Sequence, residues 1–308
     1  MPEKSEHYDI VVLGAGPAGL TAGMYAARQG LTTAIVGGEV GGQAVWAGEI
    51  ENYLGWRLVS GPELVRHFRE HISQFALTCL ESQLANAIVP ADGGFDVYTR
   101  EGTHLSARAV IIATGRAPNR LAVPGETEFI GRGVSYCATC DAAFFRGQPV
   151  AVVGSTESAC DAALALAGLD ATVTIVARAA LKAHAAMLER VAASDAITVR
   201  VGLTVSAIEG DTRVTGLAVR DDATGAEETL PVSGVFIETG SIPVSEFTGG
   251  LVEINAKGEI VVDRRCATST PGIYAAGDVT DGLGKQIIIA AGEGARAAIA
   301  ASQDLKRR

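Results

Sequence analysis

The chain has 308 residues, 48% of them hydrophobic, and its formal net charge is −10 at pH 7. A chain of this length suits two domains of ordinary size, and its apolar content argues against extensive disorder. The acidic balance argues against nucleic acid as a partner, and no apolar run reaches the ~18 residues that a membrane helix needs.

The first predicted strand covers residues 8–14 and follows an N-terminus that has no apolar signal-peptide core, which favours a cytoplasmic location. The loop Gly14-Ala15-Gly16-Pro17-Ala18-Gly19 comes next and matches the GxGxxG pattern. A helix over 16–30 and a strand over 32–38 complete a βαβ unit, the setting in which this pattern binds a dinucleotide pyrophosphate. Glu39 then either accepts a ribose hydroxyl or is a solvated loop residue.

The same pattern restarts later in the chain. A buried strand over 107–115 ends the first part, and 149–154, 157–168 and 171–178 read as strand, helix and strand. Residues 272–302 read as strand, turn and helix without a glycine pattern of their own. We therefore predict an α/β fold with two Rossmann-like three-layer nucleotide-binding domains, the second inserted into the first. The boundaries are 1–118 with 248–308, and 119–247, and the proline-containing segments 116–126 and 240–247 connect them.

Five cysteines are present, and their odd number and scatter argue against a secreted disulfide framework. Cys137 and Cys140 are close enough in sequence to form a disulfide that cycles with a dithiol. If the second cysteine opens a helix, the helix dipole lowers its thiol pKa, and Asp141 could carry the proton. A pair of structural cysteines is the alternative, and no second pair exists to complete a zinc site, so we predict no metal. Cys79, Cys160 and Cys266 are interpreted as small buried hydrophobes.

Six stretches occur in a specific order: GAGPAGL from Gly14, GGQ ending at Gln43, Glu51-Asn52, ATG from Ala113, CATCD from Cys137, and AAGDV ending at Val279. In this combination the chain resembles the low-molecular-weight thioredoxin reductases over nearly its whole length. The resemblance implies an FAD-binding first domain, a thioredoxin-like protein substrate and a homodimer. It assigns Cys140 to the flavin side, Cys137 to the substrate side and Asp141 as the acid/base.

The resemblance also implies a set of FAD-binding residues, which are Gly14, Gly16, Pro17, Ala18, Gly19, Glu39, Gly42, Gln43, Asn52, Ala113, Thr114, Gly115, Gly277, Asp278, Lys285, Gln286 and Ile287.

The second glycine loop departs from the family pattern. The family has GxGxxA and an HRRxxxR cluster for NADPH, whereas this chain has Gly154-Ser155-Thr156-Glu157, with Thr156 at the middle glycine. A β-branched side chain there crowds a pyrophosphate. Of the basic cluster only Arg178 and Lys182 could meet a 2′-phosphate, since Ala177 and Ala179 stand at the other basic positions.

The sequence therefore indicates a flavin-dependent dithiol/disulfide oxidoreductase with a donor other than NADPH. It resembles the thioredoxin-reductase-like subfamilies with degenerate NADPH motifs, in which ferredoxin is the donor or the inserted domain carries a second FAD. Two alternatives stay open: an NADPH-dependent thioredoxin reductase with a drifted nucleotide site, and a flavin redox sensor that does not turn over. The sequence leaves open the donor, the second nucleotide, the disulfide substrate and the resting angle between the domains.

Overall fold

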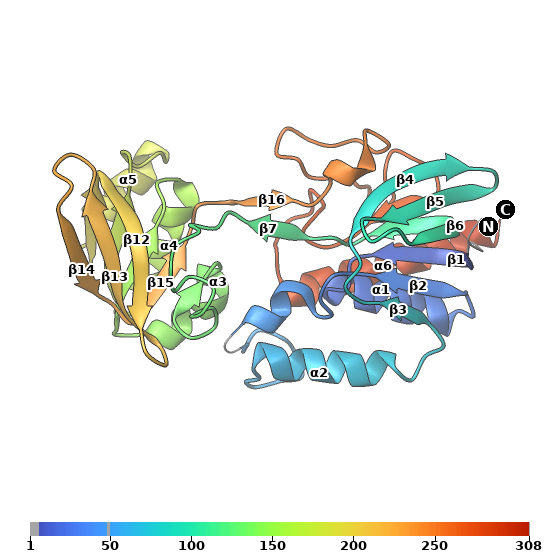
Figure 1. Cartoon of the computed structure of the whole chain (residues 1–308), viewed down its shortest axis with the longest axis horizontal. Helices are drawn as coiled ribbons and strands as arrows, with labels where there is room; N and C mark the ends of the chain where they lie inside the picture. Colours follow the sequence, from blue (N-terminus) through green and yellow to red (C-terminus); the bar gives the residue numbers. More distant parts are fainter. Residues whose placement is uncertain (1–5, 48–49, 308) are drawn as a thin grey trace.

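The computed structural model describes residues 6–47 and 50–307, which form two α/β units side by side (Figure 1). We call residues 6–47, 50–115 and 244–307 the first unit, and residues 119–240 the second unit. Each unit is organised around a parallel sheet, so the predicted α/β fold with two Rossmann-like units is confirmed.

The first sheet, as far as the structure describes it, has seven strands in the order β3-β2-β1-β6-β5-β4, with β17 also beside β6. The strands are β1 (Glu6–Leu13), β2 (Thr33–Val36), β3 (Thr78–Leu80), β4 (Ala85–Ala91), β5 (Gly94–Thr99), β6 (His104–Ile112) and β17 (Ile273–Ala275). Because β17 runs parallel to the end of β6, the C-terminal part of the chain lies in the first unit.

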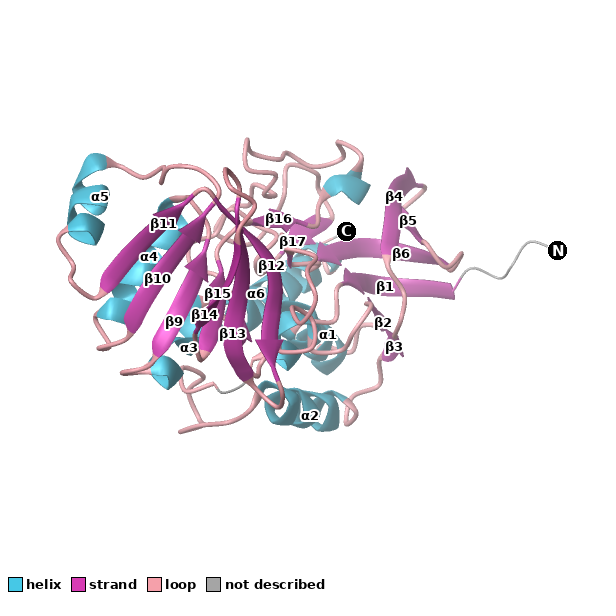
Figure 2. Cartoon of the chain, turned by 60° about the vertical axis from the view of Figure 1, so that its left-hand side comes forward, coloured by secondary structure: helices cyan, strands magenta, loops and turns pink. Residues whose placement is uncertain are grey.

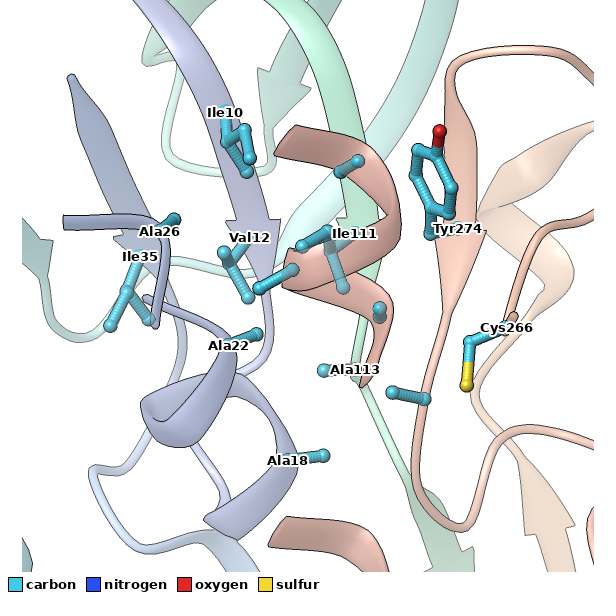
Figure 3. Close-up of a cluster of buried hydrophobic side chains, with 14 of the residues drawn as sticks. Ile10, Val12, Ala18, Ala22, Ala26, Ile35, Ile111, Ala113, Cys266 and Tyr274 are labelled. Atoms are coloured by element: carbon cyan, nitrogen blue, oxygen red, sulfur yellow. The ribbon is translucent and has the colours of Figure 1, made fainter. Parts of the chain in front are cut away.

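In the centre of the first sheet, residues 10–13 of β1 and 109–112 of β6 are buried and apolar on both sides, because both faces are covered. Residues Ile10 to Leu13 of β1 have no exposed surface. One face packs against α1 (Pro17–Arg28) and α6 (Ile287–Leu305), and Figure 3 shows Ile10, Val12 and Ile111 of this face with Ala18 and Ala22 of α1. A further helix, α2 (Gly61–Ile72), begins after Ser60, whose hydroxyl accepts the Glu63 N–H at 3.3 Å.

The second unit is also built around a parallel sheet, but different elements cover the faces of that sheet. Its sheet has the order β11-β10-β9-β15-β8. Helices cover one face, and an antiparallel sheet of β12, β13 and β14 covers the other (Figure 2). The elements are β8 (Val134–Ser135), α3 (Ala138–Asp141), β9 (Pro149–Val153), α4 (Glu157–Ala167), β10 (Thr172–Ala177), α5 (Ala185–Ala192), β11 (Ile197–Val201), β12 (Leu203–Gly210), β13 (Val214–Asp221), β14 (Glu227–Pro231) and β15 (Gly234–Ile237). Short 3-10 helices cover Gly42–Trp46, Ala142–Phe145 and Glu246–Thr248.

The chain passes between the units through β7 (Arg116–Pro118) and β16 (Ser241–Pro243), which pair antiparallel (Figure 1). Both strands fall in the segments predicted as connectors. The domain boundaries themselves, 1–118 with 248–308 and 119–247, stay a prediction. Among the described residues no helix is both long and apolar enough to span a membrane.

The contact between α1 and α6 depends on Gly294. A Cβ at this position would lie 2.0 Å from the Ala18 carbonyl oxygen, whereas a Cβ at Gly292, two residues earlier and exposed, would meet nothing within 4 Å. We expect Gly294→Ala to reduce the free energy of unfolding by about 1–3 kcal/mol, because the helices must separate. Gly292→Ala should be neutral or stabilise the helix by up to about 1 kcal/mol. Denaturant titration of both variants tests this, and equal stabilities would contradict it.

Candidate active site

The two cysteines of the CATC segment form a disulfide, with their Cα atoms 5.3 Å apart. Helix α3 begins at Ala138, so Cys137 stands directly before the helix and Cys140 lies inside it. The condition for a helix-lowered thiol pKa, that the second cysteine opens a helix, is therefore not met. The turn is too short for a dipole argument, because α3 covers only Ala138–Asp141 and continues as the 3-10 helix Ala142–Phe145.

Asp141 follows the cysteine pair and is a buried acid. Its Oδ1 atom has no hydrogen-bond partner in the described structure. Burial raises the pKa of this carboxyl, and a hydrogen bond with the Ser135 side chain only partly opposes the rise. The Ser135 hydroxyl also accepts the Cys137 N–H at 3.0 Å. The carboxyl therefore keeps its proton to a higher pH than an exposed aspartate does, beside the redox pair.

The first glycine loop has the geometry of a phosphate cradle. Gly14 has φ +117°, and a Cβ there would lie 2.1 Å from the Ala113 carbonyl oxygen. A Cβ at Gly19 would lie 1.8 Å from the Gly14 carbonyl oxygen, so this glycine lets α1 pack against the loop. A Cβ at Gly16, in contrast, would meet nothing within 4 Å. Helix α1 begins with Pro17 and no side chain caps it, so the start of the helix is open to an anion.

One cavity of about 850 Å³ joins this cradle to the redox pair. Cys137, Cys140 and Asp141 line it together with most of the predicted FAD-binding residues. Those residues are Gly14, Gly16, Pro17, Ala18, Glu39, Gly42, Gln43, Ala113, Thr114, Gly115, Gly277, Asp278, Lys285, Gln286 and Ile287. Gly19 and Asn52 are not among the lining residues, although the Asn52 Nδ2 donates to the Gln286 Oε1 at 3.0 Å.

The cavity also holds charged side chains that the sequence analysis did not select. Arg116 and Glu259 form an ion pair at 3.0 Å, and both line the cavity. Burial raises the pKa of Asp278, while Lys285 and Arg116 oppose the rise.

Glu238 lines the cavity as well. A sequence signal for Glu238 existed, since Glu238-Thr239-Gly240 repeats the Ala113-Thr114-Gly115 motif with a single change.

The second glycine loop reaches the lining of this cavity only through Ser158, among the described residues. Its predicted residues Gly154, Ser155, Thr156, Glu157, Arg178 and Lys182 are not among the lining residues. The loop is instead engaged with the segment that follows β10: the Lys182 N–H donates to the Ser155 carbonyl at 2.7 Å, and Glu157 lies 3.1 Å from His184. The hydroxyl of Thr156, at the start of α4, lies 3.1 Å from the Ser158 hydroxyl.

The residues of the large cavity fit a flavin dinucleotide. The open start of α1 offers a pyrophosphate site, and Glu39 lies beside it at the end of β2, where a ribose hydroxyl would be bound. The volume is at the upper end of the range for ligand pockets. The cysteine pair lines the same space, so a reducible disulfide and a redox cofactor would share it. In the described residues no group of three His, Cys, Asp or Glu side chains could hold a metal ion.

Comparison with known proteins gives a consistent result. Residues 8–294 match the sequence model of the family described as pyridine nucleotide-disulphide oxidoreductase. The chain is 39% identical over 306 residues to one of the alkyl hydroperoxide reductase subunits of Pseudomonas putida. The matched region covers 98% of this chain and 59% of that protein. It is 38% identical over 303 residues to a protein of Bacillus subtilis (strain 168) named NADH dehydrogenase, again with 98% and 59% covered.

The chain therefore spans about three-fifths of the length of these curated relatives. The crystal structure of thioredoxin reductase from Streptococcus pyogenes MGAS5005 superimposes with a TM-score of 0.92 at 36% sequence identity, covering 99% of this chain and 100% of that one.

Gly16 gives the sharpest test of the cradle. We expect Gly16→Val to fold but to lose FAD, because a Cβ there meets no protein atom within 4 Å and the side chain would occupy the space of the pyrophosphate. Gly292→Val is the matched control, since it also enters open space but lies on the exposed side of α6. Flavin absorbance per chain after purification measures the effect. A full complement of flavin in Gly16→Val would rule out this site.

Proposed function

The chain belongs to the pyridine nucleotide-disulphide oxidoreductase family, and on that premise we propose that it is a flavin-dependent dithiol/disulfide oxidoreductase of the thioredoxin-reductase type. FAD is the cofactor of this family. The observation that carries the proposal is the cavity in which the Cys137–Cys140 disulfide meets the first glycine loop. When bound, FAD would supply the electron pair that opens this disulfide.

The chain's own residues account for the steps that follow. Two electrons convert the Cys137–Cys140 disulfide into a dithiol, and two protons are taken up. The Cys137 thiolate then attacks a disulfide of the substrate protein and forms a mixed disulfide, and one substrate sulfur leaves as a thiol. Cys140 attacks this mixed disulfide, which re-forms the internal bond and releases the second thiol. We propose Cys137 for the substrate side because it precedes α3, whereas Cys140 lies within the helix.

Asp141 is the proposed acid/base of this exchange. A leaving sulfur needs a proton, and an attacking thiol must lose one. A carboxyl whose pKa is raised by burial holds a proton at a pH where an exposed aspartate has lost it. Its Oδ1 atom is buried and has no hydrogen-bond partner within the described structure, so no protein group there competes for the proton.

We propose that the donor is not NADPH. Thr156 replaces the middle glycine of the second loop, and Ala177 and Ala179 stand where the family has basic side chains. Ferredoxin and a second FAD in the second unit are the candidates that the sequence suggested. NADH is a further candidate, because it lacks the 2′-phosphate and one curated relative is named NADH dehydrogenase.

The substrate is proposed to be a thioredoxin-like protein, in accord with the thioredoxin reductase that the chain resembles in structure. A homodimer and a cytoplasmic location remain proposals from the same resemblance. The relatives named as alkyl hydroperoxide reductase subunits are longer than this chain, so a peroxide-reducing partner does not follow from them. A redox sensor that does not turn over is the alternative, and steady-state turnover separates the two.

Replacement of single cysteines tests the chemistry. We expect Cys140→Ser to retain FAD and to lose reduction of a disulfide protein, because no internal disulfide can form. Cys137→Ser should also lose turnover, and its free Cys140 thiolate should add a long-wavelength band to the flavin spectrum at neutral pH. Cys79→Ser is the control, because this half-buried cysteine lies in β3 and does not line the cavity. Full activity of Cys140→Ser would remove the pair from the mechanism.

Asp141→Asn should lower turnover by about a hundredfold or more while leaving the flavin bound, because the amide cannot transfer the proton. Steady-state kinetics with a disulfide protein measure this loss, and turnover within threefold of the parent protein would exclude the acid/base role.

The donor proposal predicts slow reduction of the flavin by NADPH at micromolar concentration, with no strong preference over NADH. Each lost charge-assisted partner of a 2′-phosphate removes about 1.5–3 kcal/mol, which is roughly ten- to a hundredfold in affinity. Anaerobic stopped-flow spectroscopy measures the rate. Fast, saturable bleaching by micromolar NADPH would contradict the proposal. Flavin per chain after denaturation then separates a diflavin protein, near two, from one with an external donor, near one.

A further inference from the structure

The two units contain the same sequence motif at the same place. Ile112-Ala113-Thr114-Gly115 follows the end of β6, and Ile237-Glu238-Thr239-Gly240 follows the end of β15. Each motif lies beside the strand that carries a glycine loop, since Ile112 is level with Leu13 of β1 and Ile237 with Val153 of β9. Glu238 therefore occupies in the second unit the position that Ala113 occupies in the first.

The contact with the glycine loop is also repeated. A Cβ at Gly14 would lie 2.1 Å from the Ala113 carbonyl oxygen, and a Cβ at Gly154 would lie 2.4 Å from the Glu238 carbonyl oxygen. In the first unit this position carries only a methyl group, which lines the cavity beside the phosphate cradle. In the second unit it carries a carboxylate.

The Glu238 carboxylate is bound to the start of the second cradle. Glu238 and Ser158, in the first turn of α4, line the same cavity, and the Ser158 side chain and the Ala138 N–H of the cysteine turn both act to lower the pKa of the Glu238 carboxyl. With Ser158 donating to Glu238, the Thr156 hydroxyl 3.1 Å away donates to Ser158. The Thr156 and Ser158 hydroxyls at this end of α4 therefore interact with each other and with the Glu238 carboxylate of the protein itself.

The charged groups around Glu238 do not stabilise its negative charge. The charged groups on the helices packed against it are Asp141 on α3 and Glu157 and Asp161 on α4, and Glu157 already pairs with His184. Asp161 is the charged neighbour that acts on it, and among the described residues no cation does. Burial first, and Asp161 to a smaller extent, raise the pKa of Glu238 to about 7.

We propose that the Glu238 carboxylate excludes dinucleotide phosphates from the second cradle and is a specificity-determining residue of that site. A bound diphosphate would have to approach the start of α4, where phosphate normally finds free donors and a favourable dipole. Here it meets a negative side chain that already engages the Ser158 side chain in the first turn of α4. The inference deepens the donor side of the proposed function, because it disfavours NADH and a second FAD in the second unit and leaves ferredoxin as the donor candidate. It rests on the proposed function in taking the first cradle as the flavin site.

Isothermal titration of the oxidised, FAD-loaded protein with NAD⁺ tests this without electron transfer, so its outcome is independent of disulfide reductase activity. We expect the parent protein to bind NAD⁺ about tenfold more tightly at pH 6 than at pH 8, because a group with a pKa of about 7 is then mostly neutral. Glu238→Gln should bind at least tenfold more tightly than the parent protein at pH 8 and lose most of this pH dependence.

Glu189→Gln is the matched control, because Glu189 is an exposed carboxylate of the same unit that lies on α5, outside the glycine loop. It should keep the pH dependence and remain within about threefold of the parent affinity. Equal affinities of the parent protein and Glu238→Gln at pH 8 would overturn the proposal. Should Glu238→Gln fail to fold, NAD⁺ binding by the parent protein that does not change between pH 6 and pH 8 would overturn it equally.

Discussion

The position of the redox disulfide depends on how Arg116 fixes the connection between the units. The Arg116 guanidinium donates to the Ser241 hydroxyl at 2.7 Å and to the Ser241 carbonyl at 2.6 Å, which joins β7 to β16. It also pairs with Glu259 of the first unit at 3.0 Å, and the two side chains are only 16% and 14% exposed. A charged pair with so little exposure is stable only when its hydrogen bonds are satisfied, as they are here. The β7–β16 pair is thereby held against the first unit, and the Cys137–Cys140 turn lies at the cavity that contains the first glycine loop.

The two units show how one architecture serves two chemical purposes. Both have a strand, a glycine loop and a helix, and both have a neighbouring strand that ends in the same short motif. The first unit keeps Gly16 and Ala113, so an anion can reach the start of α1. The second unit has Thr156 and Glu238 at the matching positions. Both side chains interact with the Ser158 hydroxyl at the start of α4. On our proposal the fold of the second unit is retained while its phosphate-binding surface is lost.

Sequence reasoning predicts local geometry best where a motif is formed by neighbours in the chain. The first glycine loop and the CATC segment are each complete within six residues, so their geometry follows from local backbone rules. The start of α3 at Ala138 could not be predicted, because a four-residue helix has no periodic pattern to mark it. The Asn52–Gln286 hydrogen bond and the Arg116–Glu259 pair join residues far apart in sequence, and only the fold brings them together. Glu238 was visible as a repeated motif, but its meaning required the register of β15 with β9.

The central claim is that the flavin and the Cys137–Cys140 disulfide exchange electrons within one cavity. Anaerobic titration of the FAD-loaded protein with dithionite, followed by flavin absorbance, measures this most directly. If the claim is correct, full reduction consumes two electron pairs for each flavin, one for the cofactor and one for the disulfide, and only one pair in a variant with both cysteines replaced by serine. Complete bleaching of the parent protein by a single electron pair, with the disulfide left intact, would contradict the claim.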